Sequence, residues 1–252
     1  MTAFARDYPA ESDTERIADQ QRAIDRRLGP DPAEGLLAWY PFDGEPGQAL
    51  RPHGGTGPHL QRPRKDARPL RRDEGVDGHA WPLDRTCLLN HRGILQQLAN
   101  EAQWTICFWY RPNDNAAQTW LLYSPGWQPA ISLFHDRRRP GEARLSGNLE
   151  RGRGQNRRSM AAQHPVDLLV DHWYHIGLVF DGEQPASERL ALYLDGEAVA
   201  RGGGPFNRSA RPQSLCIGHP NTRHPSGSID NLRLYQRAFD AISFRRLIAE
   251  ER

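Results

Sequence analysis

Two apolar runs joined by a polar loop, within residues 172–196, constrain the fold of this 252-residue chain more than any other stretch. The runs, Trp173 to Phe180 and Leu190 to Leu194, are rich in β-branched, aromatic and aliphatic residues. The second ends in Asp195-Gly196, which is typical of a tight hairpin turn, and continues into Glu197 to Ala200. The stretch therefore predicts two strands and a hairpin, and it contains nothing that resembles a reaction centre.

Further short apolar runs, separated by turn signals, predict strands along the rest of the chain. They lie at residues 35–44, 76–90, 104–110, 120–124, 130–135, 143–149, 214–218 and 229–235. In Trp104 to Tyr110 both faces are apolar, which predicts a central strand covered on both sides. A short helix is expected at 93–100 and another after Phe239, capped by Asp240, with its buried face formed by Phe244, Leu247 and Ile248. Many strands without long helices favour an all-β antiparallel sandwich.

Residues 1–34 are predicted to form a helical extension outside a domain at 35–252. Glu11 to Leu28 is rich in helix-forming residues, has a candidate cap at Ser12 or Asp13, and is stopped by Gly29-Pro30. Its apolar stripe is narrow, so the helix is expected to lie on its own domain or on a partner protein.

Arginine dominates the positive charge, although the net charge is only +2. Two basic segments, 51–72 and 137–158, could hold a polyanion. The candidate contacts in the second segment are Arg137, Arg138, Arg139, Arg151 and Arg153. These segments lack interleaved aromatic residues for base stacking, so nucleic acid is disfavoured and a solvated surface is the simpler interpretation.

The three cysteines, Cys87, Cys107 and Cys216, lie far apart within apolar runs, which predicts buried free thiols. The first residues lack the apolar core of a signal peptide, and no segment is long and apolar enough to insert into a membrane. If Met1 is the natural start, the protein is expected to be cytoplasmic. If the chain is a trimmed piece, it is expected to be extracellular.

Six landmarks in order resemble the laminin-G-like, concanavalin A-like lectin family, in the bacterial form often found as a binding module. The matching segments are Leu36 to Gly44, Trp104 to Asn113, Trp173 to Gly182, Leu192 to Gly196, Ile217-Gly218 and Gly227 to Phe239. Each motif is weak alone, and their order carries the likeness. The resemblance implies a jelly roll made of two sheets.

The resemblance also implies a structural calcium near the meeting point of the first and last strands. The matching positions are Asp43 and Asp230, and backbone carbonyls and water would have to complete the shell. The alternative is that Asp43 caps a turn and Asp230 accepts backbone hydrogen bonds. In the last strand, alternation predicts Leu232 facing the core, with Arg233 and Tyr235 on the outer surface, where they could meet a ligand.

Catalytic signals are sparse. The Glu-x-Asp-x-Glu strand signature of glycoside hydrolases on this fold is absent, and Asp181-Gly-Glu183 and Asp195-Gly-Glu197 are interpreted as loop or hairpin chemistry. His172 and His175 are three apart on a strand and so point to opposite faces, which excludes a shared metal. The chain is therefore expected not to be an enzyme.

Sugar binding needs a flat aromatic face beside hydrogen-bonding groups. Trp81, Trp120 and Trp127 lie near turns, and Trp127 with its neighbour Gln128 is the favoured pair. We therefore expect a non-catalytic module that binds a glycan or glycoconjugate through loops at one rim. The alternative is a protein-interaction or assembly subunit that docks through its N-terminal helix and arginine-rich loops.

Overall fold

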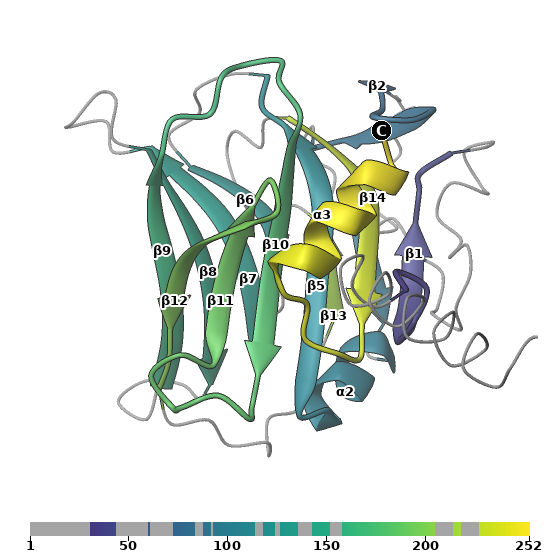
Figure 1. Ribbon diagram of the computed structural model, residues 1–252. Helices are drawn as coiled ribbons and strands as arrows, with labels where there is room; N and C mark the ends of the chain where they lie inside the picture. Colours follow the sequence, from purple (N-terminus) through teal and green to yellow (C-terminus); the bar gives the residue numbers. More distant parts are fainter. Residues whose placement is uncertain are drawn as a thin grey trace, which may run out of the picture.

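The computed structural model describes residues 31–43, 60, 73–83, 88–91, 93–113, 118–123, 127–135, 143–151, 158–204, 214–217 and 227–252. Two antiparallel sheets face each other, and a C-terminal helix lies against the outside of one of them (Figure 1). The expectation of an all-β sandwich with a short C-terminal helix is confirmed. The predicted helix at 11–28 lies outside the described residues.

The larger sheet has eight strands, and each pairs with its neighbours in antiparallel fashion. In spatial order they are β12 (Glu197–Gly202), β11 (Leu190–Leu194), β10 (Tyr174–Asp181), β5 (Gln103–Arg111), β14 (Ser228–Tyr235), β3 (His79–Pro82) and β2 (Asp73–Glu74), with β1 (Leu36–Tyr40) also paired to β14.

The smaller sheet has six strands, and a short helix, α2 (Gly93–Asn100), follows the first of them in the chain. In spatial order the strands are β4 (Leu88–His91), β13 (Ser214–Ile217), β6 (Gln118–Tyr123), β7 (Trp127–His135), β8 (Ala143–Arg151) and β9 (Arg158–Val166). β9 was not predicted, because its sequence RSMAAQHPV is polar, contains proline and has few β-branched residues.

The space between the sheets holds the main hydrophobic core. Strand β5 contributes side chains to this core from one face and to a second cluster from the other. Trp104, Ile106 and Phe108 point into this core, whereas Cys107 belongs to a second apolar cluster on the other face of the same sheet. The prediction that both faces of β5 are covered is therefore confirmed.

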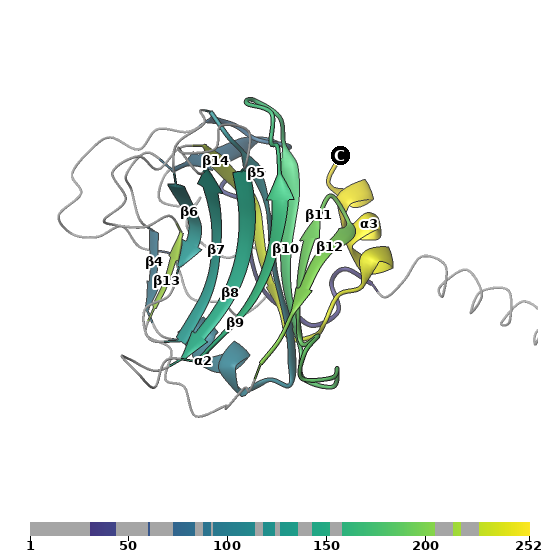
Figure 2. The same cartoon turned by 90° about the vertical axis from the view of Figure 1, so that its left-hand side faces the viewer.

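Helix α3 (Ala241–Glu250) covers the second cluster on the outer face of the larger sheet (Figure 2). Asp240 caps it as predicted, since the Asp240 carboxylate accepts a hydrogen bond from the Ser243 backbone N–H. A Cβ atom on Gly177 would lie 2.4 Å from the Phe244 ring, so glycine at this position of β10 lets the helix approach the sheet closely.

The β11–β12 hairpin turns as the Asp-Gly dipeptide predicts. Asp195 and Gly196 both have positive φ, at 48° and 83°, which is the backbone shape of a type I′ turn. The Asp195 carboxylate also accepts a hydrogen bond from the backbone N–H of His175, at 2.8 Å. This bond joins the hairpin to the start of β10.

Strand β14 has three neighbours because it is irregular in the middle. On one side it pairs with β5 along most of its length, and on the other it pairs first with β3 and then with β1. The change of neighbour occurs beside Asn231, which has a φ of 48° and interrupts the pairing with β5. Asp230 therefore lies where the first and last strands of the larger sheet meet.

The cysteines differ from the prediction of three free thiols. Cys107 is free and buried, as expected, but Cys216 on β13 is disulfide-bonded. Cys87 lies outside the described residues. The prediction was wrong for Cys216, because an odd cysteine count excludes complete pairing but does not exclude one bond.

Within the described part of the chain, no helix is both long and apolar enough to cross a membrane.

Candidate functional site

Asp43 and Asp230 lie on either side of a tight turn formed by residues 75–78. The Asp230 carboxylate is fully buried and accepts hydrogen bonds from the backbone N–H groups of Val76 and Asn231. Asp43 accepts a hydrogen bond from the His79 N–H at 2.7 Å. The pKa of Asp230 is raised to about 7, mainly by burial and to a smaller extent by the nearby Asp43 charge, against the opposing effect of the backbone hydrogen bonds.

The two glycines of this turn leave room for oxygen atoms to converge. A Cβ atom on Gly75 would lie 2.5 Å from Asp230 Oδ2 and 2.8 Å from the Asp77 carbonyl oxygen, and one on Gly78 would lie 2.2 Å from Asp43 Oδ1. Two carboxylates and a carbonyl are oxygen donors of the kind that calcium takes. Among the described residues no group of three or more His, Cys, Asp or Glu side chains could hold a metal, so carbonyls and water would have to complete a shell.

Arg233 and Tyr235 are on the outer face of the larger sheet, as alternation predicts, but they are not exposed there. Tyr235 is fully buried in the cluster beneath α3. Arg233 forms an ion pair with Glu251 at 2.9 Å and lies over the Trp39 ring, 4.2 Å from its centroid. The expectation that these two side chains meet a ligand was wrong, because the C-terminal helix and its last residues cover that part of the sheet.

The structure describes only some of the aromatic and arginine residues that the sequence predicts as ligand contacts. Register pairs Trp120 of β6 with Ser132, Gln128 of β7 with Glu150, and Trp127 with Arg151, while the side chains of Trp120, Trp127, Gln128 and Arg151 lie outside the described residues. Arg137, Arg138, Arg139 and Arg153 also lie outside them. Trp81 is buried, so it offers no face to a sugar.

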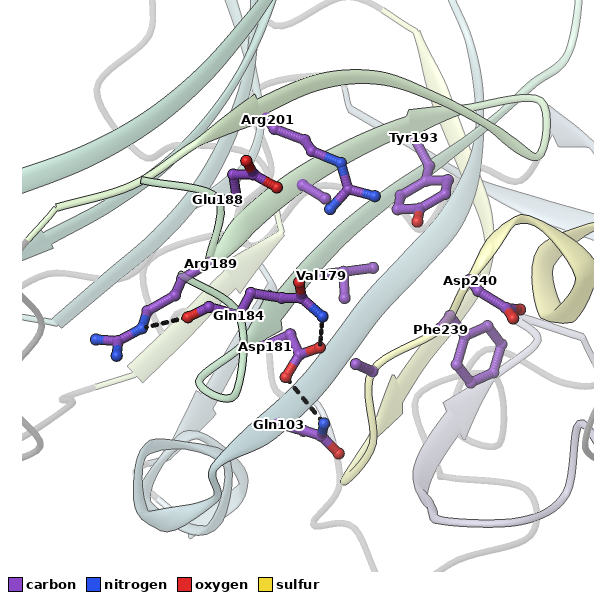
Figure 3. Close-up of a pocket in the computed structure, with 12 residues that line it drawn as sticks. Gln103, Val179, Asp181, Gln184, Glu188, Arg189, Tyr193, Arg201, Phe239 and Asp240 are labelled. Atoms are coloured by element: carbon purple, nitrogen blue, oxygen red, sulfur yellow. Dashed lines mark hydrogen bonds between the residues drawn. The ribbon is translucent and has the colours of Figure 1, made fainter. Parts of the chain in front are cut away.

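A cavity of about 200 Å³ opens on the outer face of the larger sheet, beside the start of α3 (Figure 3). We call it the outer pocket. Val179 on β10 and Ala191 on β11 line it with short apolar side chains, and residues 238–240, just before α3, form one wall. The polar lining comes from the start of β5, the end of β10, β11, the β10–β11 loop and Arg201 on β12.

Asp181 is the centre of the hydrogen bonding in this pocket. Its carboxylate accepts from the side-chain amides of Gln103, at 2.9 Å, and Gln184, at 3.0 Å, and from the Glu183 backbone N–H at 3.1 Å (Figure 3). Burial raises the pKa of Asp181, but these hydrogen bonds and the charge of Arg201 outweigh it, so the pKa lies below its usual value. Asp181 is therefore a carboxylate at neutral pH.

The loop that carries Gln184 is fixed by its own hydrogen bonds. The Asp181 backbone N–H donates to the Arg189 carbonyl at 2.8 Å, and Arg189 Nε donates to the Gln184 carbonyl at 3.1 Å. On the opposite side, the Arg201 side chain lies beside the Tyr193 ring (Figure 3). The polar groups of the pocket are thus positioned without a ligand.

No single motif in the sequence reveals the outer pocket. Its polar residues come from the start of β5, the end of β10, the loop after it and β12, which are brought together by pairings such as Gln103 with Asp181 and Ala191 with Arg201. The one visible signal is Asp181-Gly-Glu183, which the pattern alone marks as loop chemistry. Its carboxylate does organise a loop, and that loop borders a cavity.

Residues 90–242, more than half of the chain, match the family model described as the concanavalin A-like lectin/glucanase superfamily. The chain belongs to this superfamily. The superfamily name covers sugar-binding lectins and glucanases, so membership does not decide between binding and catalysis. A search of curated protein sequences finds no match to this chain.

Several solved structures share the fold of this concanavalin A-like chain. Domain 4 of the arabinanase AbnA from Geobacillus stearothermophilus, in complex with arabinotriose, has a TM-score of 0.61 at 18% identity, over 84% of this chain and 97% of that domain. A botulinum neurotoxin serotype D/C binding domain has a TM-score of 0.62 at 11% identity, over 88% of this chain but only 53% of that domain. At such identities the likeness establishes the fold alone.

Proposed function

We propose that this chain is a carbohydrate-binding module that does not cleave its ligand. The outer pocket carries the proposal, because it brings three carboxylates, two amides and two guanidinium groups beside two aromatic rings and an apolar floor. Convergent polar groups beside aromatic and apolar side chains in a preformed concavity are typical of small-ligand sites. Sugars present hydroxyl groups at their edges and C–H groups on their faces, which match these two kinds of lining.

Three structural neighbours support a binding role. The arabinanase domain was solved with arabinotriose, one toxin binding domain with SialylT and another with rat synaptotagmin II. Arabinotriose is a saccharide, whereas synaptotagmin II is a protein. The chemistry of the outer pocket favours the saccharide class for this chain.

The roles of the pocket carboxylates support a module without catalysis. A glycosidase of the usual type needs one carboxyl group that stays protonated to act as the acid and a second as base or nucleophile. Hydrogen bonds hold the pKa of Asp181 low, Asp240 caps α3 through Ser243, and Glu188 is exposed at the mouth. Prolonged incubation with oligosaccharides that bind, followed by chromatography of the products, should therefore show no cleavage.

We also propose a structural calcium between Asp43 and Asp230. The oxygen donors around the 75–78 turn suit this cation, and its charge would offset the repulsion between the two carboxylates. Calcium would hold the 75–78 turn against β14, which lies on the opposite side of β5 from the outer pocket. Its proposed role is therefore to stabilise this turn.

A glycan array, read with calcium and with chelator, tests the proposed function, and arabinotriose belongs in the probe set. We expect binding of at least one saccharide, which Gln184→Ala should weaken about tenfold, as expected when a polar contact worth about 1.4 kcal/mol is lost. Gln163→Ala is the matched control, since Gln163 is exposed and lies on β9 of the other sheet.

Two results would overturn this assignment. Failure of every saccharide to bind in either condition would remove the lectin function and leave the protein-interaction alternative, which affinity purification from the native cell would then address. Weakening by Gln163→Ala with no effect of Gln184→Ala would move the binding site to the outer face of the smaller sheet.

A further inference from the structure

The two amides in the outer pocket have fixed orientations. An ionised carboxylate can only accept hydrogen bonds, so the atom that each glutamine turns toward Asp181 must be its NH₂ group. Gln103 and Gln184 both donate to Asp181 in this way. Each amide therefore keeps its carbonyl oxygen and one N–H for another partner.

Asp181 itself has little capacity left for a ligand. A carboxylate has about four acceptor positions, and three hydrogen bonds from Gln103, Gln184 and the Glu183 N–H already reach it. Asp181 is thus a positioning residue, and the amides of Gln103 and Gln184 are the groups that would touch a ligand. Each presents a donor and an acceptor side by side, which is what a hydroxyl group needs.

The charges that line the pocket do not favour an anion. Asp181, Glu188 and Asp240 are acidic, whereas Arg189 and Arg201 are basic. The positive charge of Arg201 interacts with the Asp181 carboxylate. The Arg201 guanidinium therefore already has a negative group nearby. A sugar carboxylate entering this pocket would meet more negative than positive groups, and like charges repel.

The size of the cavity limits how much of a glycan can enter. At about 200 Å³ it is smaller than the roughly 300–1,000 Å³ typical of pockets for drug-sized ligands. Residues 238–240 form one wall and the loop that carries Gln184 forms another, so the cavity is bounded on two sides. A single ring at the end of a chain fits these limits better than an internal segment.

We infer that the outer pocket binds one neutral sugar ring at the end of a glycan, through the amides of Gln103 and Gln184. This inference rests on the proposed carbohydrate-binding function. Arg201 adds donors at one side, and the short side chains of Val179 and Ala191 leave a flat apolar floor for the ring face.

Saturation-transfer NMR and calorimetry on the wild-type chain provide the first test. The probes are methyl glycosides of glucose, galactose and mannose, and methyl glycosides of glucuronic, galacturonic and mannuronic acid. We expect at least one neutral glycoside to bind and its uronic acid counterpart to bind at least tenfold more weakly. For oligosaccharides of that sugar, affinity should change less than threefold beyond two units.

Gln103→Met and Gln184→Met provide the second test, because methionine keeps the length of the side chain and removes the amide. Each should weaken the neutral glycoside at least tenfold while circular dichroism and melting temperature stay near wild type. If either variant fails to fold, the comparisons of uronic acids and of chain lengths on wild-type protein still test the inference.

The outcomes separate the two claims. Tight binding of uronic acids, affinity that rises with each added unit, or indifference to both methionine variants would overturn this inference and leave a carbohydrate-binding module with another site or ligand class. Absence of saccharide binding altogether would overturn the proposed function, and this inference with it.

Discussion

The Arg233 guanidinium and the Glu251 carboxylate form an ion pair at 2.9 Å, and their side chains are only 11% and 4% exposed. The other oxygen of Glu251 accepts a hydrogen bond from the Trp109 indole N–H at 2.7 Å. Residues just beyond α3 are thereby attached to two neighbouring strands, β14 and β5.

Replacing Glu251 by glutamine should therefore leave a buried, uncompensated guanidinium. Removing one partner of a buried ion pair costs about 3–5 kcal/mol, and we expect Glu251→Gln to lower the free energy of unfolding by about that much. Glu250→Gln is the control, since Glu250 is 51% exposed and pairs with Arg246 within the helix. Urea unfolding curves that shift equally for the two variants would contradict a special role for the buried pair.

His175 predicts a stability that depends on pH. Its ring is fully buried between Trp109 and Phe244, and its Nδ1 has no hydrogen-bond partner. Burial, with a smaller contribution from the charges of Arg233 and Arg252, lowers the pKa of His175 from 6.5 to about 3. Between those pH values the unfolded chain binds a proton that the folded chain rejects, so stability falls as the pH decreases through this window.

The contribution of His175 amounts to at most about 1.4 kcal/mol per pH unit. Urea unfolding between pH 7 and pH 4.5 measures it, with His175→Phe as the comparison, because phenylalanine keeps an aromatic ring and cannot be protonated. We expect the variant to lose less stability than wild type over this range. Parallel pH profiles for the two proteins would show that His175 does not carry the effect.

Cys216 predicts a specific thiol count. Because Cys107 is free and Cys216 is bonded, wild-type protein unfolded without reductant should show one reactive thiol. Cys216→Ser should show two, since the partner cysteine is released. Three thiols in wild-type protein produced in an oxidising compartment would contradict the bond. Structural disulfides persist in such compartments, so we propose that this domain folds in one.

The proposed calcium site predicts a thermal shift that requires Asp230. Ligand at one hundred times its dissociation constant stabilises a folded protein by about 2.7 kcal/mol, so added calcium should raise the melting temperature and chelator should reverse the rise. Asp230→Asn should abolish the shift, whatever its own effect on stability, whereas Asp181→Asn should retain it. An undiminished calcium shift in Asp230→Asn would exclude this residue as a ligand.

Much of the fold could be predicted because strand signals are local. Apolar runs and Asp195-Gly196 placed β10, β11 and their hairpins to within a few residues, and alternation gave the correct faces for Leu232 and Tyr235. β9 was not predicted because its stability comes from pairing with β8 along its whole length. The composition of the strand itself does not indicate this contribution.

The candidate site could not be predicted in the same way, because register and covering elements decide it. Gln103 and Asp181 become neighbours only through the pairing of β5 with β10, which no local pattern specifies. Tyr235 was placed on the correct face, but its exposure depended on where α3 lies. Alternation tells which side of a sheet a residue occupies and says nothing about what covers that side.

The pairing of β14 with three other strands also affects how the chain folds. Trp39 on β1 donates a hydrogen bond to Asn231, 192 positions away in the sequence, so the centre of the larger sheet joins widely separated parts of the chain. Contacts of this range are slow to form, because long loops must close before the pairing compensates for their entropy. We therefore expect folding in milliseconds to seconds, with β1, β3 and β5 incompletely paired until β14 is in place.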